Sequence, residues 1–84
     1  MLQVSVADEV LSALETLTRT DEVRHNQNLE LFELGLLDSF GVVELLVLLS
    51  DRLSIDLSPA EFDRRGWATP HKIITYLERR LGDP

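Results

Sequence analysis

The chain has 84 residues, which is enough for one small domain and too few for two, so we expect a single domain over residues 1–84. Its net charge of −7 argues against nucleic-acid binding, because a nucleic-acid-binding protein needs a basic face that replaces phosphate counterions. The chain contains no cysteine, which excludes a disulfide framework and a thiolate zinc site.

The N-terminal segment does not have the pattern of a secretion signal. Residues 1–10 already include Asp8 and Glu9 and lack a basic cluster. The longest apolar run, residues 45–49, is far too short to cross a bilayer. We therefore expect a soluble protein of the cytoplasm.

The first predicted element is a helix over residues 6–19. Ser5 and Asp8 form an acidic variant of the capping box at its start. One face of this helix is apolar and predicts a buried stripe. The stripe consists of Val6, Val10, Leu11, Leu14 and Leu17.

Residues 20–38 show no helical periodicity and predict a long connection. Its first half, residues 21–28, is polar and is interpreted as a loop. Its second half, residues 29–37, is rich in leucine and should pack into the core, with one short helical turn. A connection this long in a small domain is typical of a functional segment.

The second predicted helix covers residues 39–53 and has two apolar faces. The face predicted to lie in the core carries Val42, Leu45, Leu46, Leu49 and Leu53. The face that carries Ser39 also carries Phe40, Val43, Glu44, Val47 and Asp51. A surface helix would ordinarily be charged there, so the pattern indicates a binding patch. The alternative is that other helices cover Val43 and Val47.

Two further start signals follow, each a capping residue before a proline. Ser58-Pro59 predicts a short helix that ends at Gly66, and Thr69-Pro70 predicts a helix that Gly82 closes. We expect Trp67 to plug the core with its indole N–H on a carbonyl. The stripe of the last helix is Ile73, Ile74, Leu77 and Leu81. Arg64 and Arg65 are interpreted as a solvated helix end; the alternative is pairing with acids of the first connection.

No stretch has the alternation of a strand, so the predicted fold is all-α. It is a small helical bundle of three principal helices and one short helix, with a long first loop.

The sequence shows no motif that would bring a nucleophile, an acid and a base together for catalysis. Ser39 lacks the G-x-S-x-G elbow of a nucleophile, and nothing places His25 or His71 near it. No cluster with metal-ligand spacing is present, so we predict no metal site. If Asp38 caps the helix, the Ser39 hydroxyl is free, and the helix N-terminus would stabilise a phosphate ester on it. The alternative is that Ser39 is simply an N-cap.

These residues resemble the acyl carrier protein family. Asp38-Ser39-Phe40 is similar to the Asp-Ser-Leu motif of that family, with Phe in place of Leu, and residues 43–45 resemble the start of its recognition helix. Three longer stretches resemble most closely the branch of the family that carries D-alanine. They are residues 31–41, 61–64 and 67–74, within a resemblance that spans about 29–81.

The resemblance implies a non-catalytic carrier that presents a covalent prosthetic group. A phosphopantetheinyl transferase would attach 4′-phosphopantetheine to Ser39, beside the flanking Asp38. A separate ATP-dependent ligase would load D-alanine as a thioester. Membrane acyltransferase machinery at the cytoplasmic face would then use it for D-alanylation of lipoteichoic acid. Partner proteins would contact the face at Phe40, Val43, Glu44 and Val47, mainly by apolar contact.

Two other functions fit the same pattern. One is a stand-alone acyl or peptidyl carrier of another biosynthetic cluster. The other, from a different class, is an unmodified helical adaptor that binds a protein through the same helix face. Replacement of Ser39 by Ala would leave an adaptor functional and inactivate a carrier. We expect a monomer in each case.

Overall fold

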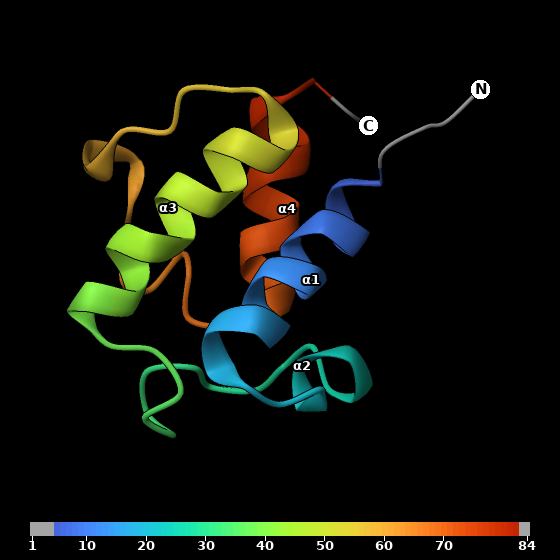
Figure 1. The fold of residues 1–84 in the computed structure, drawn as a ribbon, viewed down its shortest axis with the longest axis vertical. Helices are drawn as coiled ribbons and strands as arrows, with labels where there is room; N and C mark the ends of the chain where they lie inside the picture. The colour runs from blue at the N-terminus through green and yellow to red at the C-terminus, as the bar shows by residue number, and fades with distance from the viewer. Residues whose placement is uncertain (1–4, 83–84) are drawn as a thin grey trace.

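The computed structural model describes residues 5–82, and all regular secondary structure in that range is helical. The elements are α1 (Val6–Thr18), α2 (Glu22–His25), α3 (Ser39–Leu53), a single 3₁₀ turn (Pro59–Glu61) and α4 (Pro70–Arg80). The long helices α3 and α4 both pack against α1 (Figure 1). This arrangement confirms the all-α class, the three principal helices and the long first connection. The ends of the expected domain, residues 1–4 and 83–84, lie outside the described residues.

Side-chain caps set the ends of the long helices, as the sequence predicts. The Asp8 N–H donates to Ser5 Oγ at 3.3 Å, and the Lys72 N–H donates to Thr69 Oγ1 at 3.2 Å. Each bond satisfies one of the N–H groups that the first turn of a helix leaves without a partner. At the other end of α1, Arg19 takes a left-handed conformation with φ of 59° and ends the helix one residue before the predicted boundary.

The core lies where the apolar stripes of the three long helices meet. Connections also contribute to it, through Leu31, Leu37, Leu57 and Trp67. Large side chains from these helices that are almost completely buried include Val10, Leu14, Leu45, Leu49, Ile73 and Leu77. One predicted core residue is wrong: Leu81 follows the last turn of α4 and is 37% exposed, because the stripe there has run past the edge of the bundle.

The polar stretch at residues 21–28 contains α2, so its interpretation as a loop is wrong. Val23 is completely buried and anchors the four-residue helix to the core. The Arg24 guanidinium bonds Asp8 at 3.1 Å and Glu15 at 2.9 Å, which joins α2 to α1. A helix of one turn is too short to show a 3.6-residue period, because only one of its residues faces the core.

The short helix begins at Pro59 with the Ser58–Glu61 capping box, as predicted, but its predicted extent to Gly66 is wrong, because it consists of the 3₁₀ turn alone. Phe62 leaves the turn in an extended conformation. A second turn then forms, in which the Gly66 N–H donates to Asp63 Oδ2 at 3.2 Å and the Trp67 N–H donates to the Asp63 carbonyl at 2.8 Å. Trp67 is buried as predicted, but its indole N–H has no hydrogen-bond partner within residues 5–82.

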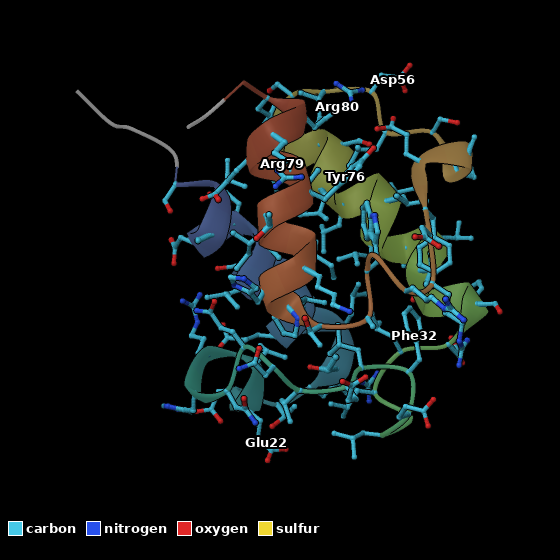
Figure 2. The ribbon with its side chains drawn as sticks, turned by 180° about the vertical axis from the view of Figure 1, so that it is seen from behind. Glu22, Phe32, Asp56, Tyr76, Arg79 and Arg80 are labelled. Atoms are coloured by element: carbon cyan, nitrogen blue, oxygen red, sulfur yellow. The ribbon has the colours of Figure 1, made fainter. Side chains whose placement is uncertain are left out.

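Glu61 fastens the 3₁₀ turn to α4. Its carboxylate accepts hydrogen bonds from Tyr76 Oη at 2.7 Å, Arg80 Nε at 2.8 Å and the Ser58 N–H at 3.2 Å. Figure 2 shows Tyr76 and Arg80 on α4, with Arg80 beside Asp56, whose carbonyl accepts from Arg80 at 2.9 Å. The Arg80 guanidinium, then the Tyr76 hydroxyl and the Ser58 N–H, lower the pKa of Glu61 to about 2. The connection between α3 and α4 is therefore held at its middle by a charged group.

We predict that this carboxylate makes the protein sensitive to acid. Because the pKa of Glu61 is lower in the folded than in the unfolded chain, its stabilisation is complete above pH of about 4.5 and is lost as the pH falls towards about 2. Glu61→Gln should therefore be less stable than wild type at pH 7, and the difference should shrink below about pH 4.5. Chemical denaturation followed at several pH values measures both free energies of unfolding. A difference independent of pH would contradict the prediction.

Candidate functional site

The chain that leads to Ser39 is fixed by one buried leucine. Leu31 has no exposed surface, and its N–H donates to the Ala68 carbonyl at 2.8 Å. Its carbonyl accepts from the N–H groups of Leu36 at 2.9 Å and Leu37 at 3.1 Å. Leu31 thus ties the first connection to the segment before α4 and closes residues 31–37 into a compact loop.

A glycine makes this loop tight enough to return to Leu31. Gly35 has a φ of +73°, a left-handed conformation that costs glycine little and other residues more. Its N–H donates to the Phe32 carbonyl at 3.1 Å. Leu37 follows with 5% exposure and enters the core immediately before the site. Burying a leucine in this way stabilises the fold by about 1.5–3 kcal/mol, so the start of α3 has a firm anchor.

Asp38 is the N-cap of α3, and Ser39 is its first residue. Asp38 Oδ1 accepts from the Gly41 N–H at 2.8 Å, and the Asp38 carbonyl accepts from the Val42 N–H at 2.9 Å. Ser39 is exposed, and its hydroxyl has no hydrogen bond within residues 5–82. The prediction that Asp38 fills the capping role and leaves the Ser39 hydroxyl free is confirmed, and the simple N-cap alternative for Ser39 is wrong.

Gly41 has a part in this site that sequence reasoning missed. A Cβ atom at this position would lie 3.1 Å from Leu37 Cδ2 and 3.4 Å from Asp38 Oδ1. The glycine therefore gives room both to the buried anchor and to the capping carboxylate. Its position in the first turn of a helix, where glycine is otherwise unfavourable, was the available signal.

The N-terminus of α3 is suited to a phosphate group on Ser39. The N–H groups of Ser39 and Phe40 have no acceptor within residues 5–82, and the first turn of the helix contains no acidic residue. Free N–H groups and the positive end of the helix dipole both stabilise an anion placed there. The residues present therefore fit a phosphoryl group linked through Ser39.

An exposed apolar strip runs along α3 from Ser39. We call it the docking face: Phe40 is 72% exposed, Val43 52% and Val47 66%, with exposed Glu44 among them. The alternative that other helices cover Val43 and Val47 is therefore wrong. The two valines also line a shallow hollow of about 370 Å³ between α1 and α3, together with Leu17. Apolar side chains this exposed and this close together indicate a surface that binds a partner.

On its other side, Ser39 lines a groove of about 280 Å³. We call this the Ser39 groove. Its lining residues are Phe32, Ser39, Val42, Val43, Pro59, Phe62 and Arg64. Three connected parts of the chain thus meet beside the hydroxyl: the loop before α3, the first turns of α3 and the segment after the 3₁₀ turn.

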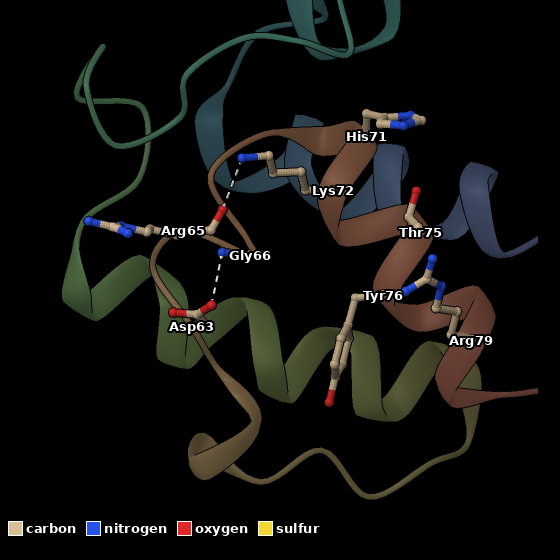
Figure 3. Close-up of a pocket in the computed structure, with 8 residues that line it drawn as sticks. All are labelled: Asp63, Arg65, Gly66, His71, Lys72, Thr75, Tyr76 and Arg79. Carbon is tan, nitrogen blue, oxygen red and sulfur yellow. Dashed lines mark hydrogen bonds between the residues drawn. The ribbon is translucent and has the colours of Figure 1, made fainter.

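Another hollow of the described residues lies elsewhere and does not include Ser39. It has a volume of about 510 Å³ and opens beside α4, where Arg65, Lys72 and Arg79 line it with Asp63 (Figure 3). The Lys72 ammonium donates to the Arg65 carbonyl at 3.2 Å. These cations sit on an open surface.

Residues 5–82 contain neither a membrane-spanning helix nor a cluster of metal ligands. No helix there is long and apolar enough to span a bilayer. No three His, Cys, Asp or Glu side chains there gather in a way that could hold a metal ion.

This chain is a small helical bundle, and the serine at the start of α3 has a hydroxyl that makes no hydrogen bond within residues 5–82. This arrangement is that of an acyl carrier domain. Residues 8–82 match the family model described as the phosphopantetheine attachment site. The chain is 52% identical over 71 residues to the D-alanyl carrier protein of Listeria monocytogenes, a match that covers 84% of this chain and 91% of the relative. It is 45% identical over 75 residues to the D-alanyl carrier protein of Enterococcus faecalis, a match that covers 89% of this chain and 96% of the relative. It is 44% identical over 79 residues to that of Lacticaseibacillus rhamnosus, a match that covers 94% of this chain and 98% of the relative. The chain therefore belongs to the phosphopantetheine-attachment family and, within it, to the D-alanyl carrier proteins.

Membership in this family indicates a covalent 4′-phosphopantetheine prosthetic group. The family is one of carriers, so the chain holds a group on which separate enzymes act and performs no catalysis of its own. The matched range contains Asp38, Ser39 and the whole docking face.

We predict that the two residues at the start of α3 contribute very differently to stability. Asp38→Ala removes the cap and should lower the free energy of unfolding by about 0.5–2 kcal/mol. Ser39→Ala removes an exposed hydroxyl without a hydrogen bond and should change it by less than about 0.5 kcal/mol. Denaturant titration of both variants measures the difference. A larger loss in Ser39→Ala than in Asp38→Ala would show that the capping roles are reversed.

Proposed function

We propose that this chain carries D-alanine as a thioester on a 4′-phosphopantetheine arm attached to Ser39 Oγ, and that residues 1–84 act as one carrier domain. The observation that carries the proposal is the exposed Ser39 hydroxyl at the first position of α3, whose cap Asp38 supplies at 2.8 Å. This arrangement stands in a chain 52% identical to a D-alanyl carrier protein.

Attachment requires a hydroxyl that can reach the active site of another enzyme. A bond forms between Ser39 Oγ and the phosphorus that bears pantetheine in coenzyme A, and the pyrophosphate bond breaks with release of 3′,5′-ADP. The proton of Ser39 goes to a base of the transferase, since no histidine or carboxylate of this chain bonds the hydroxyl within residues 5–82. The free N–H groups of Ser39 and Phe40 then face a new negative charge. When bound, the arm supplies the thiol that forms the thioester.

The docking face gives the partners of the carrier a surface beside the attachment point. The proposed partners are a phosphopantetheinyl transferase, an ATP-dependent D-alanine ligase and membrane acyltransferase machinery that works on lipoteichoic acid at the cytoplasmic face. Phe40, Val43 and Val47 present apolar area, and Glu44 adds one charge among them. Partner binding should therefore depend mainly on burial of apolar surface, with charge in an assisting role.

We predict that coenzyme A and a broad-specificity phosphopantetheinyl transferase add one phosphopantetheine to the wild-type chain and none to Ser39→Ala. Intact-mass spectrometry measures the addition. The modified protein should then accept D-alanine from a D-alanine ligase in preference to L-alanine. A second known carrier protein serves as the positive control for the transferase. If the positive control is modified and the wild-type chain is not, the result favours the adaptor function. If the modified chain is loaded preferentially with another amino acid or acyl group, the result favours a carrier of a different biosynthetic pathway.

We also predict that the docking face responds more to lost apolar area than to salt. Val43→Asp should slow loading by the ligase about tenfold or more, because a buried apolar contact of an interface is replaced by a charge that must be desolvated. Raising the ionic strength from about 0.1 to 0.5 M, which shortens the Debye length to about half, should slow it less. The rate of thioester formation at limiting carrier measures both effects.

Leu81→Asp is the matched control for this experiment. It makes the same change of charge at an exposed leucine outside the docking face, at the end of α4. Its loading rate should stay within about twofold of wild type. Equal effects of Val43→Asp and Leu81→Asp, or a salt effect larger than that of Val43→Asp, would contradict the apolar docking face.

A further inference from the structure

Arg64 lies over the Phe32 ring, and it shares a neighbouring hollow with the acidic side chains of Glu30 and Glu33. Its guanidinium carbon lies 4.8 Å from the centre of the Phe32 ring, a cation–π contact that replaces the solvated helix end expected for it. Within residues 5–82 its side chain has no hydrogen bond or ion pair, whereas Arg24, Arg52 and Arg80 all bond carboxylates. The donors of Arg64 are therefore free, while the aromatic ring restrains where the guanidinium lies.

Arg64 and Ser39 line the same groove. The remaining lining of the Ser39 groove is apolar. It includes Val43 of α3, Pro59 of the 3₁₀ turn and Phe62 directly after that turn. Phe62 in turn contacts the Phe32 ring edge to face, with the ring centres 5.7 Å apart. The groove thus combines the Arg64 guanidinium with apolar side chains. The Ser39 hydroxyl, which is the proposed attachment point, lies at its border.

The chemistry of the arm matches this lining. Its first group is a phosphodiester with one negative charge, and the next is a quaternary carbon that bears two methyl groups. A guanidinium binds phosphate oxygens through paired N–H donors, and apolar walls take up methyl groups. We propose that the Ser39 groove is a subsite for the first part of the arm, in which Arg64 binds the phosphodiester and Phe62 and Val43 contact the methyl groups. The proposal rests on attachment of the arm at Ser39.

Weak contacts are enough to fill such a subsite. A group tethered at the border of a groove has an effective concentration on the order of millimolar or higher, so an affinity of the same order already occupies it about half the time. The Arg64 contact is exposed to solvent and screened by salt, and it therefore lets the arm leave as readily as it binds. A free ligand of the same chemistry would not accumulate there at ordinary concentrations.

The experiment compares unmodified and modified protein by ¹H–¹⁵N NMR. Three chains are used: wild type, Arg64→Gln and Arg65→Gln. Arg65 is the matched control, because it loses the same charge at the adjacent position and lines the hollow of Figure 3, but not the Ser39 groove. Intact mass first establishes complete modification of each. The signals read are the amides of Phe32 and Phe62 and the indole N–H of Trp67, whose ring centre is 6.0 Å from that of Phe62.

In wild type and Arg65→Gln, modification should shift all three signals. In Arg64→Gln the shifts should fall to half or less, and about 0.5 M salt should reduce the wild-type shifts in the same way. Equal shifts in Arg64→Gln and wild type, or complete modification without shifts at Phe62 and Trp67, would overturn the subsite and leave attachment at Ser39 intact. Absence of any mass gain would overturn attachment, and the subsite with it.

Discussion

The burial of Leu31 is the constraint on which the position of the site depends. Its backbone joins two connections that are far apart in the sequence, through one bond to Ala68 and two from residues 36 and 37. Leu37 can then enter the core with Asp38 immediately behind it, and α3 begins at a fixed place. A second backbone bond, from the His71 N–H to the Gln27 carbonyl at 2.9 Å, ties the first turn of α4 to the first connection nearer to α2. The backbone that leads to the site is thus fixed by hydrogen bonds, while the Ser39 side chain itself is exposed.

Ser39 is free because another residue satisfies the helix end. A serine in the N-cap position would accept a hydrogen bond from an N–H of the first turn through its hydroxyl oxygen, and a modification of that oxygen would disturb the cap. Here Asp38 holds that role at 2.8 Å, with Gly41 giving it room. The chain can therefore exist with or without a group on Ser39 while α3 begins at the same residue. This independence suits a carrier, whose attached group is acted on by separate enzymes.

The parts of this site that follow from local chemistry could be predicted, and the parts that follow from tertiary contact could not. The cap by Asp38 and the bounds of α3 depend on residues within one helix, so spacing reveals them. The exposure of Val43 and Val47 depends on whether other helices cover them, and spacing left both possibilities open. The stacking of Arg64 on Phe32 joins residues from two connections without periodicity, and the role of Gly41 depends on how Leu37 turns back into the core. The one-turn helix α2 depends on the single buried Val23, which leaves no pattern. Trp67 was correctly placed in the core, but its indole N–H points where no carbonyl of the described chain lies.

Val43 links the two surfaces beside Ser39, because it lines both the Ser39 groove and the hollow between α1 and α3. A partner that covers the docking face must bury this side chain, and an arm that lies in the groove contacts the same side chain. Two ligands that share a residue affect each other's binding, and the effect is reciprocal. Docking of an enzyme would therefore weaken the hold of the groove on the arm, and a docked arm would weaken the enzyme's hold on the carrier. If the groove holds the arm as proposed, these small contacts would hold it loosely between encounters and release it at the surface where the next enzyme binds.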